Sequence, residues 1–114
     1  SREDLNSLTK DVENKFGPMP QEALNLFQVR SFALSFKNKG LLSAFTKNGF
    51  LVLEFSEDAN SSLSKILNDF GGFLTSQGFN FTYIKKEGLF GISIKISSSD
   101  PYFLIKKLLG FLYD

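Results

Sequence analysis

The side chains that most often perform catalysis near neutral pH are missing from this chain of 114 residues, which contains no histidine and no cysteine. Histidine is the usual acid–base group and the commonest metal ligand, and cysteine supplies nucleophiles, disulfides and zinc ligands. Glu57 and Asp58 form an adjacent carboxylate pair that could act as acid and base. They directly precede a predicted helix start, where carboxylates stabilise the helix dipole, so we interpret them as structural. The sequence therefore disfavours an enzyme.

Other short motifs also have structural interpretations. Gly71-Gly72 lacks the G-x-x-x-x-G-K-S/T pattern of a phosphate loop. The pairs Lys85-Lys86 and Lys106-Lys107 are interpreted as solvated positions. Aromatic residues in one predicted strand could form a base-stacking platform, but core packing is favoured because arginine and lysine do not alternate with them; they are Phe79, Phe81 and Tyr83.

The composition indicates one compact domain. Hydrophobic residues make up 42% of the chain and include 14 phenylalanines, which is enough for a core. The net charge of +1 lacks the basic excess of a typical nucleic-acid-binding surface. The chain opens with Ser-Arg-Glu-Asp and has no run of 18 apolar residues, so neither a signal peptide nor a membrane span is expected. The absence of cysteine fits a reducing compartment, and we expect a cytoplasmic protein.

Two helices are predicted at the start. Leu5, Leu8, Val12 and Phe16 form a narrow apolar stripe with helical spacing, which predicts a lead-in helix over residues 1–16. Gly17 and Pro18 should end it. A second helix over residues 20–39 begins at Pro20, ends before Gly40 and is apolar on more than one side. We therefore expect it to be the central helix.

The body of the domain, residues 41–114, is predicted to contain two hairpins and two helices. Asn48-Gly49 is a strong signal for a two-residue turn. This turn predicts three facing pairs, namely Thr46 with Leu51, Ala44 with Leu53, and Leu42 with Phe55. The opposite face of this hairpin carries Lys47, Ser43, Glu54 and Ser56, with Phe45, Phe50 and Val52 among them.

A third helix should follow the first hairpin. Asn60 or Ser61 can cap it, and it should end at either Phe70 or Ser76, because Gly71-Gly72 weakens a helix. Strands over residues 79–85 and 89–96 form the second hairpin. Asp100-Pro101 should start the last helix, with an inner stripe of Tyr102, Ile105, Leu109 and Leu112. The fold class is therefore α+β, with a small, mainly antiparallel sheet packed on helices.

One stretch indicates more than structure: "DVENKFGPMPQEALNLFQVRSFALSFKNKGL", residues 11–41. It resembles the start of the C-terminal domain of the bacterial transcription-repair coupling factor (Mfd) family. In that family an acidic helix leads into Arg-Phe/Tyr-Gly-Pro-Leu-Pro, followed by Asn-Leu, an arginine and a glycine at set distances. The matching residues here are Phe16, Gly17, Pro18, Pro20, Asn25, Leu26, Arg30 and Gly40, with Met19 in place of the leucine. The layout resembles the family over the whole chain, and the specific matches lie in its first third.

The resemblance implies that the parent protein is an ATP- and magnesium-dependent DNA translocase. It would release stalled RNA polymerase and recruit the excision-repair protein UvrA. This domain would be a monomeric, non-catalytic module without a cofactor or a membrane contact. It would pack on the N-terminal UvrB-like module of the same protein and mask the UvrA-binding surface. The resemblance implies that the acidic helix before the Phe-Gly-Pro turn takes part in this contact, so Asp11, Asn14 and Lys15 are the expected interface. Asp11 matches the first acidic position of the family, Asn14 departs from the second, and Lys15 replaces an arginine.

Two alternatives remain from the sequence. The domain could bind DNA or RNA polymerase directly, which would require lysines clustered on one face and a steep dependence of affinity on salt. A small enzyme is the third possibility, and the missing histidine, cysteine and phosphate loop argue against it.

Overall fold

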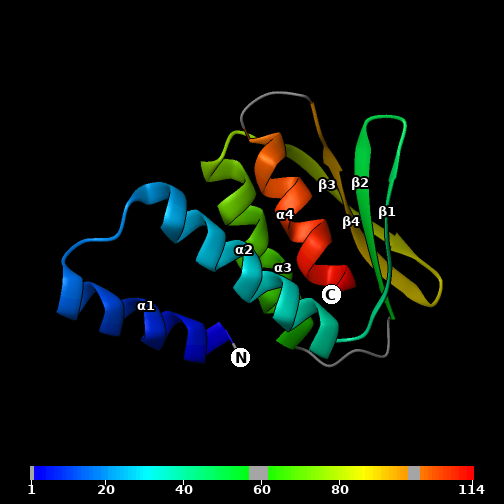
Figure 1. Cartoon of the computed structure of the whole chain (residues 1–114). Coiled ribbons are helices and arrows are strands. Elements are labelled where there is room, and N and C mark those ends of the chain that lie inside the picture. Colours follow the sequence, from blue (N-terminus) through cyan, green and yellow to red (C-terminus); the bar gives the residue numbers. More distant parts are fainter. Residues whose placement is uncertain (1, 57–61, 98–100) are drawn as a thin grey trace.

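The computed structural model describes residues 2–56, 62–97 and 101–114, and Figure 1 shows how its elements are arranged. The elements in chain order are α1 (Arg2–Phe16), α2 (Gln21–Asn38), β1 (Leu41–Lys47), β2 (Phe50–Ser56), α3 (Ser62–Ser76), β3 (Asn80–Lys86), β4 (Leu89–Lys95) and α4 (Tyr102–Tyr113). This order and the α+β class are as predicted. The predicted caps Asn60, Ser61 and Asp100, the pair Glu57–Asp58, and the side chains of Leu5 and Phe16 lie outside the described part.

Glycine and proline set the ends of the first two helices. Gly17 takes a left-handed conformation with φ of +86°, and its N–H donates to the carbonyl of Glu13 at 2.8 Å. Pro20 is the residue before α2, and its carbonyl accepts the N–H groups of Ala23 and Leu24. Gly40, with φ of +87°, follows the end of α2. The chain therefore turns sharply where the sequence predicts it.

The strands form one sheet in the order β1-β2-β4-β3, with every neighbouring pair antiparallel. Asn48 and Gly49 both have positive φ, and the predicted pairs Thr46–Leu51 and Ala44–Leu53 are present. The predicted pair of Leu42 with Phe55 is wrong. An irregularity in β1 places Leu41 opposite Phe55 instead and leaves Leu42 62% exposed.

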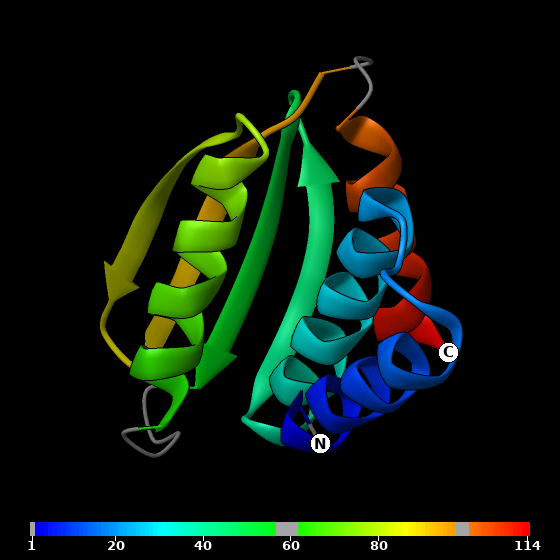
Figure 2. The same cartoon turned by 90° about the vertical axis from the view of Figure 1, so that its left-hand side faces the viewer.

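The four described helices lie on one side of the sheet, as Figures 1 and 2 show. α2, α3 and α4 form the layer next to the strands, and α1 lies outside that layer against α2. None of these four helices covers the opposite face of the sheet. The domain is therefore asymmetric, with one helical side and one open β side.

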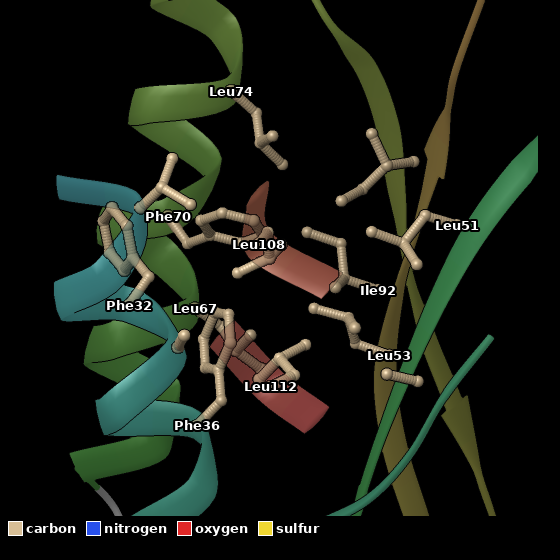
Figure 3. Close-up of a cluster of buried hydrophobic side chains, with 14 of the residues drawn as sticks. Phe32, Phe36, Leu51, Leu53, Leu67, Phe70, Leu74, Ile92, Leu108 and Leu112 are labelled. Atoms are coloured by element: carbon tan, nitrogen blue, oxygen red, sulfur yellow. The ribbon is translucent and has the colours of Figure 1, made fainter. Parts of the chain in front are cut away.

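The core lies between the sheet and the inner helices (Figure 3). Phe32 and Phe36 of α2 contact Phe70 of α3 with ring centroids 5.0 Å apart, and Phe36 meets Phe55 of β2 edge-on at 5.4 Å. Each such buried side chain stabilises the fold by about 1.5–3 kcal/mol relative to exposure. The sheet side of the core is made of fully buried aliphatic residues, namely Leu51, Leu53, Ile92 and Ile94.

The last helix buries a different stripe from the predicted one. Leu108 is buried, whereas Leu109 and Tyr102 are only partly buried. Ile105 and Leu112 are buried as predicted. Because α4 is apolar around most of its circumference, spacing alone did not determine which side faces α2.

The third helix continues through both glycines to Ser76, which settles the open boundary. Phe81 and Tyr83 lie over this helix, and the Tyr83 hydroxyl donates to the carbonyl of Leu67 at 3.2 Å. Phe79 and Phe81 pack against the core, which confirms their interpretation as packing residues, whereas Tyr83 is 47% exposed. Among the described helices, none has both the length and the apolarity of a membrane span.

Candidate interdomain interface

The expected interface residues lie on the solvent side of α1. The side chains of Asp11, Asn14 and Lys15 are exposed, whereas Thr9 and Val12 are half-buried. Residues three and four apart on a helix are neighbours, so Asp11 lies beside both Asn14 and Lys15. The helix thus presents a continuous polar surface that carries a carboxylate and an ammonium group.

The predicted apolar stripe of α1 is only partly covered. Leu8 belongs to that stripe by spacing, yet its side chain is 47% exposed. It lies one turn before Asp11, and Lys15 follows one turn later on the same side. The exposed side of α1 therefore combines one large apolar side chain with charged neighbours, which is the composition of many protein-contact surfaces.

The attachment of α1 to the domain is limited to one neighbour. Its principal contacts are with α2, and Figure 2 shows it as the outermost layer on the helical side. None of its described side chains is fully buried. A helix held in this way leaves most of its circumference available to a partner.

The Gly17–Pro20 turn connects α1 to α2. Pro18 is exposed and Met19 is half-buried. Any residue with a side chain would be strained at position 17, because φ is +86°, although the space around Gly17 is free. The turn residues therefore determine the direction in which the chain passes from α1 to α2.

The remaining motif residues tie α2 to other elements. The Asn25 amide donates to Gln77 Oε1 at 3.4 Å and accepts from Gln21 at 2.9 Å, which connects α2 to the end of α3. The Arg30 guanidinium lies 5.8 Å from the ring centre of Phe111 in α4. Leu26 is half-buried. Asn25 and Arg30 thus tie α2 to its neighbours, and Arg30 is exposed whereas Asn25 is half-buried.

Within residues 2–56, 62–97 and 101–114, no group of acidic side chains is arranged to hold a metal ion. Lys106 and Lys107 of α4 lie over the neighbouring rings of Tyr102 and Phe103, at 5.0 and 5.4 Å from the ring centres.

Sequence reasoning missed one arrangement, on the open side of the sheet. Lys47 and Lys95 both pair with Phe50, from β1 and β4 respectively. The Asn48-Gly49 turn signal already places Lys47 opposite Phe50. No signal in the sequence could have placed Lys95 there, because that contact depends on how the two hairpins pair with each other.

The chain was compared with family models, curated sequences and solved structures. The sequence model of the family described as TRCF domain matches residues 1–66, which is 66 of the 114 residues. A solved structure described as the C-terminal domain of transcription-repair coupling factor is similar over 98% of this chain and 68% of its own chain. The sequence identity is 15% and the TM-score is 0.45. No curated protein sequence gives a significant match.

Proposed function

We propose that this chain is a non-catalytic interaction domain acting in transcription-repair coupling. The chain belongs to the TRCF domain family, and the proposal starts from that membership. In this proposal the exposed side of α1 docks on the N-terminal UvrB-like module of the same protein. The docked domain covers the surface that UvrA binds, until the parent protein engages a stalled RNA polymerase. The proposal places the domain in the bacterial cytoplasm, where its partners are.

The observation that carries this proposal is the exposed surface of α1. Asp11, Asn14 and Lys15 are all exposed, and Leu8 lies among them with nearly half of its surface in solvent. A docked partner would remove the apolar surface of Leu8 from water, which supplies affinity. The charges would supply orientation and specificity, since complementary charges steer association and disfavour wrong partners.

The position of α1 supports the same proposal. The helix contacts mainly α2, and Figure 2 shows it on the outside of the helical layer. The family assignment is consistent with a domain that performs no chemistry itself. In this proposal the domain binds neither ATP nor magnesium, and both bind to the motor domains of the parent protein. Contacts with DNA and RNA polymerase in the translocation cycle are likewise assigned to those other domains.

The charge reversal Asp11→Arg tests the interface in the full-length protein. If the partner surface is basic, the arginine places like charges together, which can cost several kcal/mol. We expect the variant to retain more UvrA than the wild type in a pull-down without DNA or polymerase. The stability of the domain should change by no more than about 0.5 kcal/mol, because the position is exposed.

The matched control is Glu87→Arg, in the turn between β3 and β4. Glu87 is also exposed, and its replacement changes the net charge by the same amount at a site away from α1. UvrA recovery should stay at the wild-type level in this variant. Equal, low recovery from wild type and Asp11→Arg would refute docking through Asp11. A direct titration of this chain against the N-terminal module would then show whether another surface makes the contact.

A further inference from the structure

The sheet has an outer face that none of the four described helices covers. Successive residues of a strand point to opposite sides of a sheet. Because Leu51 and Leu53 of β2 are buried toward the helices, Phe50 and Val52 point outward. By the same alternation, Ser93 and Lys95 of β4 point outward beside them. We call this surface the outer sheet face.

One row of the outer sheet face alternates cations with an aromatic ring. Phe50 pairs with Lys47 on β1 and with Lys95 on β4. Neighbouring strands lie about 4.8 Å apart, so one ammonium-bearing side chain starts on each side of the phenyl ring. The Phe50 side chain is 40% exposed, which is a large fraction for a phenylalanine in a central strand.

A second aromatic ring extends the row into a small platform. Phe45 of β1 pairs with Val52 and is 39% exposed. Val52 and Phe50 are two residues apart on the same strand, so Phe45 is a diagonal neighbour of Phe50. The two rings and the valine therefore form a contiguous apolar surface that is bordered by Lys47 and Lys95.

The charge on the outer sheet face is mainly positive. Among the paired residues of the sheet, the outward lysines are Lys47, Lys86 and Lys95. The outward carboxylate is Glu54, which accepts a hydrogen bond from the Ser43 hydroxyl at 2.8 Å. A ligand that complements this face is negatively charged and presents flat apolar groups.

We propose that the outer sheet face binds single-stranded DNA. Bases would stack on Phe45 and Phe50, and backbone phosphates would pair with Lys47 and Lys95, as on other aromatic platforms with basic borders. Val52 offers an apolar contact for the methyl group of thymine. The proposal concerns a different surface from the α1 interface and does not depend on it.

The arrangement favours a nucleic acid over a docked helix of an acidic protein. A docked helix would need a continuous apolar surface along the strands. Here Ser93 and Gly91 separate the Phe45–Phe50–Val52 platform from the outward apolar residues at the opposite corner, Ile84 and Leu89. Aromatic rings that each lie near a cation match the alternating bases and phosphates of a nucleic acid better than they match a helix.

Fluorescence anisotropy with a labelled short oligothymidylate tests the proposal on this chain. We expect measurable binding at low salt and an affinity loss of about 5- to 150-fold for Phe50→Ala, since a stacked base contributes about 1–3 kcal/mol. The double variant Lys47→Ala, Lys95→Ala should lower the slope of log affinity against log salt by about 1.4, for two lost phosphate contacts. Both lysines are exposed, so this variant stays informative if Phe50→Ala weakens the fold.

The matched controls lie on α4. Phe103→Ala removes an aromatic ring that is also exposed, and Lys106→Ala, Lys107→Ala removes two cations. These variants should bind oligothymidylate like the wild type. Amide chemical shifts should change at residues 45–52 and 93–95 on titration.

Several results would overturn the proposal. One is the absence of oligothymidylate binding, and another is an equal affinity loss in the α4 controls. Binding of oligouridylate of the same length as tightly as oligothymidylate would refute the assignment to DNA. Binding of an acidic amphipathic peptide to this face, without any binding of oligothymidylate, would identify the surface as a protein-docking site instead.

Discussion

Gly71 and Gly72 are neighbours in α3, but the space around them differs. A Cβ atom added at Gly71 would lie 2.7 Å from the Tyr83 hydroxyl oxygen and 2.9 Å from Cζ of Phe81. A Cβ atom added at Gly72 meets nothing within 4 Å. Replacement by alanine should therefore stabilise the domain at Gly72 but not at Gly71, although the two positions are adjacent in one helix.

The difference in stability between the two variants comes from overpacking, because both variants gain the same helix propensity. Each replacement gains about 1 kcal/mol of helix propensity, because alanine loses less backbone entropy than glycine. Only Gly71→Ala forces Tyr83 and Phe81 to move, and overpacking of this kind costs about 1–3 kcal/mol. The shared propensity gain cancels in the comparison. Gly72→Ala should therefore be more stable than Gly71→Ala by about 1–3 kcal/mol.

Thermal and urea denaturation of the three proteins measure this difference. For a domain of this size, 1 kcal/mol shifts the melting temperature by about 4 °C. Tyr83→Phe removes the nearest contact, and also the hydrogen bond to the Leu67 carbonyl, so Gly71→Ala should cost less in the Tyr83→Phe background than in the wild type. Equal stabilisation by the two alanines would show that β3 does not approach α3 at Gly71, and the reasoning about these aromatics would be refuted.

Three further predictions concern the turn, a tie between helices, and the absence of catalysis. Gly49→Val should lower the free energy of unfolding by about 1–3 kcal/mol, because a β-branched residue is strained at φ of +82°, and an unchanged denaturation midpoint would contradict this. Asn25→Ala should cost about 0.5–1.5 kcal/mol and speed amide exchange around Gln77, and a double-mutant cycle with Gln77→Ala that shows no coupling would disprove the tie. The purified chain should not release phosphate from ATP, with or without DNA, and turnover in that assay would contradict a non-catalytic domain.

The order of the elements could be predicted because local chemistry determines where each one starts and ends. Gly17 and Gly40 adopt the positive φ values that end helices, and Asn48-Gly49 forms the predicted tight turn. Such residues act through their own backbone preferences, so a single sequence is enough to interpret them.

Features that depend on distant parts of the chain were not predictable in the same way. The irregularity that leaves Leu42 exposed lies at the start of β1, shortly after the end of α2, and nothing in the local sequence pattern indicates it. Leu108 is buried in place of Leu109 because the neighbouring helix determines how α4 is rotated. Helix α3 passes through two glycines because Gly71 provides the space that the β3 aromatics occupy.

The candidate interface was predictable in part. Helical spacing predicted Asp11 and Asn14 on a polar face away from the apolar stripe; both are exposed, although Asp11 is a neighbour of Leu8. The same spacing predicted that Leu8 would be covered, whereas the structure leaves it half in solvent, because α2 is the main neighbour of α1. How much of an amphipathic stripe is covered depends on the number of neighbours, and spacing alone does not give that number.

The strand order β1-β2-β4-β3 has a consequence for how this domain can be divided. The segment that matches the TRCF family model ends at residue 66, inside α3, whereas β2 is bonded to β4, which comes later in the chain. A chain cut at that point would leave one edge of β2 without its partner and would expose Leu53 and Phe55 to water. Unpaired strand edges with apolar side chains promote aggregation. The stretch that matches the family model therefore lacks β4, the strand that pairs with β2 and completes the sheet.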